Sequence, residues 1–328
     1  MKARFLAAAA ASAALLAACS GGGSTVVPSQ NTSAGPAAPQ TSASSEFRSV
    51  STFVAQNTAT GEYVRIFPTK DAIDTLRATG GLRATQAVAN LTYHGGPIQT
   101  NPKIYVVYWG SSWNSTTGDP NGEKARANAF FGIIGGSSWL NSVTQYTQSD
   151  GQHVGNAAGS FVGSYVDTSS TPPRSPTQSA IANEAAKAAA HYGDYSSNAS
   201  YVVALPHGIK PSGFGTQYCA WHSSATVSGK GTISYTNDPY LTDVGASCGE
   251  NSVNAGSAGV LDGVTIVYGH EQGETETDPQ PNTGWLDSSG AENGDKCAWT
   301  GLINNPAAGG YPTQPLWSNA NNGCVQSY

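Results

Sequence analysis

Two continuous apolar runs constrain the fold of this chain more than any other feature. Residues 104–109 (IYVVYW) and 201–205 (YVVAL) are rich in β-branched and aromatic residues and lack polar alternation, which is typical of strands buried on both faces of a sheet. Pro206 then ends the second run. A third, shorter strand is predicted at residues 232–235.

Two segments between these runs predict helices. Residues 177–191 (TQSAIANEAAKAAAH) are mostly strong helix formers. Residues 121–134 (NGEKARANAFFGII) carry Glu123 early, where a carboxylate suits a helix start. Residues 139–147 are expected to extend that helical region. The order strand, helix, helix, strand predicts an α/β fold, with one domain built on a central, mostly buried sheet flanked by helices.

The N-terminus has the pattern of an export signal. Residues 5–18 form an apolar run of 14 residues after a short positive start, too short to span a bilayer but typical of a signal peptide. The run ends in Leu-Ala-Ala-Cys19, which resembles the lipobox of bacterial lipoproteins. We therefore expect a signal peptide at residues 1–18 and a lipid on Cys19. An ordinary secretory signal that contains a cysteine is the competing interpretation.

The segment after Cys19 is predicted to be a tether. Residues 20–46 consist almost entirely of Ser, Gly, Pro, Thr and Ala, so they cannot bury a core and would reach about 25–30 Å as a random coil. Several acyl chains hold a protein stably at a membrane. Ser20, rather than aspartate, follows the cysteine, which favours outer-membrane delivery in an organism that has one. The protein is expected to face away from the cytoplasm in the cell envelope.

Two segments make up the remainder. Residues 47–88 mix apolar and charged positions, so a hairpin or short helix packing on the domain competes with a propeptide. Residues 89–328 are assigned to one globular domain, which is long enough for a sizeable core and is expected to be monomeric. The net charge of −6 with only 15 Lys and Arg argues against a nucleic-acid partner.

Four cysteines remain once Cys19 is set aside, and an even number in an exported chain favours disulfides. Among the three possible pairings we favour Cys219 with Cys248 and Cys297 with Cys324. Their spacings are not those of a cysteine zinc site. The C-terminal part is expected to be rich in loops and to carry both bridges.

Residues 261–278 (LDGVTIVYGHEQGETETD) contain the clearest candidate chemistry. On a helix over 261–276, His270 and Glu274 lie one turn apart on one face, as two ligands of one metal ion require. Glu271 then points to the neighbouring side, where it can act as general base. This zincin-like arrangement follows the logic of His-Glu-x-x-His zinc peptidases, with a glutamate in place of the second histidine. It predicts a zinc-dependent hydrolase, most simply a peptidase.

Three features favour other interpretations of this segment. Residues 264–268 (VTIVY) are compatible with a strand, which would separate His270 from Glu274. Glycines at 269 and 273 each disfavour a helix by about 1 kcal/mol relative to Ala. An exposed face of Glu and His on a surface helix is also common.

Candidates for the third ligand lie downstream and on other segments. Glu292, in the following turn-rich stretch, is the first choice and Asp295 the second. Asp278 precedes Pro279 and lies about 12 Å along a continuing helix from the first ligand, so it is assigned a supporting or turn-fixing role. His222 and His207 adjoin the second apolar run, and either one is an alternative to Glu292.

The acidic stretch 278–295 has two further interpretations. Oxygen ligands in loops rich in Gly and Asn suit calcium. The same residues are also ordinary formers of turns and caps.

Five segments occur in a fixed order along the chain: LTYHGGP at 91–97, the strand at 104–110, the helix from 121, YCAW at 218–221 and LDGV at 261–264. In this order they resemble the phosphate-induced protein 1 (EXORDIUM-like) family. The resemblance covers residues 89–328 and implies an exported globular domain with a helix at 261–276. Plant members are associated with extracellular growth control, without a settled enzymatic activity. The HExxE, TDP and GDKCAW sequences resemble bacterial and fungal relatives.

A non-enzymatic surface module is the second candidate function. Aromatic faces stack on sugars, so tryptophans in polar loops would suit binding of a glycan or a partner protein, although core packing is their more common use. The tryptophans are Trp109, Trp113, Trp139, Trp221, Trp285, Trp299 and Trp317.

Overall fold

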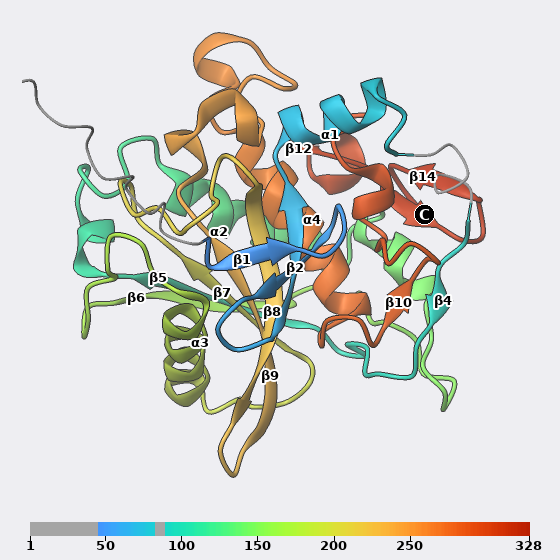
Figure 1. Ribbon diagram of the computed structural model, residues 1–328, viewed down its shortest axis with the longest axis horizontal. Helices are drawn as coiled ribbons and strands as arrows, with labels where there is room; N and C mark the ends of the chain where they lie inside the picture. Colours follow the sequence, from blue (N-terminus) through green and yellow to red (C-terminus); the bar gives the residue numbers. More distant parts are fainter. Residues whose placement is uncertain (1–44, 83–88) are drawn as a thin grey trace, which may run out of the picture. The chain divides into compact units, whose positions relative to one another are not determined.

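An eight-stranded mixed sheet forms the centre of the protein (Figure 1). The computed structural model describes residues 45–82 and 89–328, so the predicted signal peptide, Cys19 and most of the tether lie outside the described residues. The strand order is β1-β2-β3-β8-β9-β7-β5-β6. Strands β6, β5, β7 and β9 are parallel, and β1, β2, β3 and β8 are antiparallel to their neighbours. The strands are β1 Phe47–Ser49, β2 Val54–Asn57, β3 Tyr63–Pro68, β5 Lys103–Trp109, β6 Phe161–Asp167, β7 Ala199–Ala204, β8 Tyr218–Val227 and β9 Gly231–Asp238.

The predicted α/β class is confirmed, and the two apolar runs are the inner strands β5 and β7. All of β7 is buried, as its sequence predicts. The third strand, β9, extends further than residues 232–235, because it pairs along its length with β8 in a hairpin. On its other side β9 pairs in parallel with β7, and the C-terminal half of β9 is buried as well.

Helices cover both faces of the sheet. α2 (Glu123–Ile134) and α4 (Asp262–Thr277) contact each other, and α4 contacts β8, whereas α3 (Gln178–Tyr192) packs on β7 and β9. The Thr177 hydroxyl caps α3 by accepting from the Ala180 N–H, and Gly193 ends α3 with a φ of 71°. The expected extension at 139–147 is instead a 3-10 helix at Leu140–Gln145.

The remaining elements are short and lie mostly in the C-terminal part. No helix among the described residues is long and apolar enough to cross a membrane. The short strands are β4 Thr92–Tyr93, β10 Trp285–Leu286, β11 Ile303–Asn305, β12 Tyr311–Thr313, β13 Leu316–Ser318 and β14 Gly323–Val325, and the other 3-10 helices are Ser111–Asn114, Leu241–Asp243, Gly245–Cys248, Gly256–Ala258, Asp295–Cys297 and Pro306–Ala308.

Helix α4 is buried over its whole length, and this explains both its β-branched start and its glycines. A Cβ on Gly269 would lie 2.9 Å from the Trp139 ring and 3.1 Å from Phe130. A Cβ on Gly273 would lie 3.1 Å from Leu316. Glycine therefore allows close packing, and the packing outweighs a local helix penalty of about 1 kcal/mol at each position.

Residues 45–82 belong to the central sheet. Strands β1, β2 and β3 form one end of the sheet, and β3 pairs with β8. Helix α1 (Lys70–Ala78) follows, with the Thr69 hydroxyl accepting from the Ala72 N–H at 3.4 Å. Within the predicted segment 47–88, the described residues 47–82 therefore form three strands of the sheet and one short helix.

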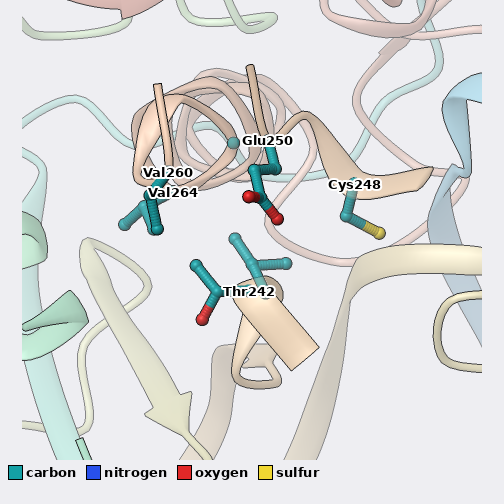
Figure 2. A pocket seen from close by; sticks show the side chains of 7 residues that line it. Thr242, Cys248, Glu250, Val260 and Val264 are labelled. Carbon is teal, nitrogen blue, oxygen red and sulfur yellow. The ribbon is translucent and has the colours of Figure 1, made fainter. Parts of the chain in front are cut away.

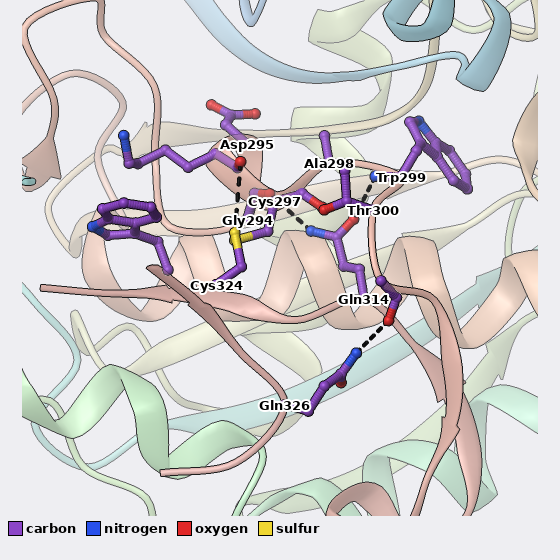
Figure 3. The surroundings of a disulfide bond; sticks show 12 residues. Gly294, Asp295, Cys297, Ala298, Trp299, Thr300, Gln314, Cys324 and Gln326 are labelled. Carbon is purple, nitrogen blue, oxygen red and sulfur yellow. Dashed lines mark hydrogen bonds between the residues drawn. A yellow bond between two sulfur atoms is a disulfide. The ribbon is translucent and has the colours of Figure 1, made fainter. Parts of the chain in front are cut away.

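Both favoured disulfides are confirmed. Cys219 pairs with Cys248 and Cys297 with Cys324, at sequence separations of 29 and 27 residues. The second bridge ties strand β14 to the loop after α4 (Figure 3).

We expect the paired substitution Cys297→Ala and Cys324→Ala to lower the free energy of unfolding by about 3 kcal/mol, because it releases a loop of this length in the unfolded chain. Urea denaturation measures the change. The difference from wild type should disappear in reducing buffer, which serves as the control. An unchanged unfolding free energy in oxidising buffer would contradict the expectation.

Glu123 connects α2 to a distant segment. Its carboxylate is buried and accepts the N–H groups of Leu241 at 3.2 Å and Thr242 at 2.8 Å. Burial is the largest influence on this carboxyl and raises its pKa to about 8, although the two backbone N–H groups act in the opposite direction.

A carboxyl whose folded pKa is raised destabilises the fold progressively as pH rises from its unfolded value toward its folded value. We therefore expect Glu123 to lower the free energy of unfolding between pH 4.5 and about 8, by at most about 1.4 kcal/mol per pH unit. Urea denaturation of wild type and Glu123→Gln at pH 5, 6, 7 and 8 isolates this contribution. A difference between the two proteins that does not change with pH would contradict it.

Candidate metal centre

Helix α4 brings the ionisable side chains of His270, Glu271 and Glu274 together in the protein interior. His270 Nε2 lies 3.1 Å from Glu274 Oε1, as their spacing of one helical turn predicts. Glu271 lies beside them, and each of the three side chains is at most 1% exposed. The alternative of a solvated Glu and His face is therefore wrong.

Three more ionisable side chains from other elements meet those of α4. His222 from β8 places Nδ1 3.0 Å from Glu271 Oε2. From the loop after α4, Glu292 Oε1 lies 3.7 Å from His222 Nε2, and Asp295 Oδ1 lies 3.7 Å from His270 Nε2. We call these six residues the buried cluster: His222, His270, Glu271, Glu274, Glu292 and Asp295.

Two groups of three residues within the buried cluster have the spacing of metal ligands. One group is His270, Glu274 and Asp295, and the other is His222, Glu271 and Glu274. Within each group all ligand atoms lie within 4.8 Å of one another, and the separations from the histidine nitrogens run from 3.0 to 3.9 Å. Ligands at about 2.1 Å around a tetrahedral zinc ion lie about 3.4 Å apart. Glu274 belongs to both groups, with Oε1 toward His270 and Oε2 toward His222.

Five ligand atoms of the buried cluster have no hydrogen-bond partner among the described residues. Most buried polar atoms in proteins are hydrogen-bonded, so several such atoms in one place are typical of a site that binds an ion or water. Imidazole nitrogen and carboxylate oxygen are ordinary ligands for zinc. The donor set therefore fits a divalent cation. The five atoms are His222 Nε2, His270 Nε2, Glu271 Oε1, Glu292 Oε1 and Asp295 Oδ1.

Arg65 from β3 binds the outer side of the buried cluster. Its Nε donates to Glu292 Oε2 at 2.6 Å, and its terminal nitrogen lies 3.3 Å from Asp295 Oδ2. It also donates to the carbonyl of Gly290 and to Asn282 Oδ1. The two carboxylates thus give one oxygen each to Arg65 and turn the other inward. No motif in the sequence marks Arg65 as a site residue.

Burial controls the protonation of the buried cluster. It lowers the pKa of His270 to about 4 and that of His222 well below its usual range, so both rings are neutral. Burial also raises the pKa of Glu274 to about 7 and that of Glu271 well above its usual value. Burial opposes the charge on Arg65, but the adjoining carboxylates, Glu292 first, outweigh it and raise the Arg65 pKa. Neutral imidazole is the form that binds a metal ion.

Gln314 determines which nitrogen of His270 carries the proton. Its amide nitrogen donates to the Gly294 carbonyl at 2.8 Å and lies 3.1 Å from His270 Nδ1, while its oxygen accepts the Trp299 N–H at 3.4 Å. With the amide in this orientation, His270 Nδ1 faces a donor, which favours the tautomer that has its proton on Nε2. Metal binding at Nε2 requires the amide to turn, so that its oxygen accepts a proton moved to Nδ1.

The other predicted site residues have different roles. Asp278 accepts the backbone N–H groups of Asn282, Thr283 and Gly284 and so holds the turn that follows α4. His207 is about half exposed and pairs with Asp243, in neither group of metal-ligand spacing. The structure therefore does not bring His207 to the candidate centre.

The carboxylates of residues 278–295 do not converge as a calcium loop requires. Asp287 pairs with Lys296 at 3.1 Å and accepts the N–H groups of Ser289 and Ala291. Asp278 holds the preceding turn, and Glu292 and Asp295 face Arg65. Asp278 and Asp287 thus stabilise turns, whereas Glu292 and Asp295 belong to the buried cluster.

Core packing accounts for most of the tryptophans. Trp113, Trp139 and Trp221 are at most 2% exposed, and three others at most 5%. Figure 2 shows a hollow beside the first turn of α4, lined mainly by apolar atoms, with Glu250 as its ionisable side chain. Neither feature offers an open aromatic surface for a sugar.

Comparisons with protein-family models, with curated proteins and with solved structures found no match. The resemblance to the phosphate-induced protein 1 family stays a prediction. The case for function therefore rests on the buried cluster.

Proposed function

We propose that this protein is a metal-dependent hydrolase, most simply a zinc peptidase that acts on polypeptides outside the cytoplasm. The observation that carries the proposal is the convergence of His270, Glu274 and Asp295, with separations from His270 Nε2 of 3.1 and 3.7 Å. His270 Nε2 and Asp295 Oδ1 have no hydrogen-bond partner in the described parts of the chain. One imidazole and two carboxylates form an acceptable zinc ligand set.

The residues around this group have complementary roles. A bound zinc ion would polarise a substrate carbonyl and lower the pKa of a coordinated water. Glu271 Oε1 has no hydrogen-bond partner among residues 45–82 and 89–328 and is the candidate general base. Its other oxygen lies 3.0 Å from His222 Nδ1, which holds the carboxylate in position. Glu292 lies beside His222 and takes part in binding Arg65.

Metal content tests the proposal directly. We expect the purified protein to bind zinc, and Glu274→Ala to abolish binding because Glu274 belongs to both three-residue groups. Asp295→Ala and His222→Ala separate the two groups, since each removes a ligand from only one. Elemental analysis after dialysis against zinc measures the stoichiometry. Zinc content unchanged in Glu274→Ala would rule out this centre.

Hydrolysis tests the assigned base. The Phe67 ring stacks on His270 and covers this proposed ligand. The comparison is therefore made in chains that also carry Phe67→Ala, which removes the cover. We expect Glu271→Gln to keep zinc but to slow casein hydrolysis about 100- to 10,000-fold, as removal of a general base does. The half-buried Glu250, outside the cluster, supplies the matched control Glu250→Gln. Equal rates for both variants would remove Glu271 from the mechanism.

We also propose that the chain is exported and anchored by a lipid on Cys19, which lies outside the described residues. The support is the apolar run of residues 5–18, the lipobox-like sequence and the Ser- and Gly-rich segment that follows. Cys19→Ala should lose palmitate labelling and move from the membrane to the soluble fraction. Membrane attachment unchanged in this variant would indicate another anchor.

A further inference from the structure

The N-terminal strands occupy the position next to β8 that covers the buried cluster. They form one end of the sheet and join it through the antiparallel pairing of β3 with β8 (Figure 1). In that pairing Arg65 lies opposite His222, and Phe67 lies opposite Ala220. Without β1, β2 and β3, strand β8 would be an edge strand with free backbone groups beside the candidate metal centre.

Alternate side chains of β3 enter the buried cluster. Arg65 and Phe67 are two residues apart and therefore point to the same face of the sheet. The Phe67 ring stacks on His270 with a centroid distance of 3.7 Å and on Trp299 at 4.5 Å. Phe67 thus lies between two rings, and both Arg65 and Phe67 are essentially unexposed.

The contacts of Arg65 are those of a recognition site for a basic side chain. Two carboxylates, a backbone carbonyl and the Asn282 amide oxygen surround its guanidinium. Such charge-assisted bonds are strong and directional. Pairing of an extended peptide with a sheet edge, with pockets for alternate side chains, is a common mode of peptide recognition.

We infer that β8 is the strand that binds an extended polypeptide substrate, and that β3 occupies this place as an internal, substrate-like strand. The inference rests on the proposed hydrolase function. The substrate has a basic residue in the Arg65 position and, two residues later, an aromatic residue between the rings of His270 and Trp299. The chain with β3 in place is therefore inhibited, because its own strand blocks the cluster.

Cutting the chain between β3 and the remaining domain tests this inference. A recognition sequence for a site-specific endopeptidase replaces residues 83–88, and the folded full-length protein is cut in its native state, so that the N-terminal fragment is free to dissociate. Zinc transfer to a coloured chelator and hydrolysis of an Arg-x-Phe peptide are measured before and after cutting. Both rates should rise about thirtyfold or more, because in the uncut chain β3 must first leave the cluster, and this breaks the buried ion pairs of Arg65 with Glu292 and Asp295.

Peptides corresponding to the blocking strand supply the specificity test. A synthetic peptide of residues 60–70 (TGEYVRIFPTK) should bind the cut protein, slow zinc transfer and inhibit hydrolysis. The same peptide with Arg65→Glu should do none of these, because it brings a carboxylate to Glu292 and Asp295. Equal binding of the two peptides, or equal rates before and after cutting, would overturn the inference.

The outcomes distinguish this inference from the proposed function. If the cut protein binds the peptide and releases zinc faster but hydrolyses nothing, the hydrolase proposal fails, and β8 stands as a polypeptide-binding strand. If the uncut wild-type protein hydrolyses the substrate as fast as the cut protein, the hydrolase proposal stands and the blocking role of β3 is wrong.

A variant of the uncut chain tests the inference even if the cut protein loses its fold. Arg65→Met removes the guanidinium that holds β3 in the cluster, so this variant should bind the 60–70 peptide about thirtyfold more tightly than the uncut wild type does. Arg48→Met removes a guanidinium from the exposed Arg48 of β1 and should leave peptide binding unchanged. Circular dichroism confirms that both variants fold. Equal peptide binding by the two variants would also overturn the inference.

Discussion

The balance of charge in the buried cluster governs how the rest of the structure is arranged around it. All four carboxylates of the buried cluster are shielded from solvent. An isolated buried charge costs several kcal/mol unless a partner compensates it. Arg65 compensates part of this charge by binding the outer oxygens of Glu292 and Asp295. The inner oxygens have no partner within the described residues, which is why a divalent cation fits.

Two contacts hold the loop after α4, which carries Glu292 and Asp295, in place. Cys297 follows Asp295 by two residues and is tied to Cys324, and Gln314 bonds the Gly294 carbonyl (Figure 3). Space around Gly294 is also limited, because a Cβ there would lie 2.7 Å from His270 Nδ1. The loop therefore lies as close to α4 as its backbone allows. The disulfide, which is not itself part of the cluster, helps to hold the loop in this position.

Strand β3 links the fold to the proposed activity. The stacking of Phe67 on His270 and the ion pairs of Arg65 account for the burial of the cluster and stabilise the N-terminal end of the sheet. Stability and access to the site are therefore opposed. The proposed hydrolase would need an open path to its ligands, whereas Arg65 and Phe67 of β3 lie directly against them.

Local periodicity was enough to predict the inner strands β5 and β7, the helices α2, α3 and α4, and the spacing of His270 and Glu274. The cysteine spacing also favoured the correct disulfides. In contrast, long-range contacts of the folded chain bring Arg65 to Glu292 across 227 residues, His222 to Glu271, and Asp295 to His270. Strand pairing and loop packing bring these groups together, and neither leaves a signal in the local sequence.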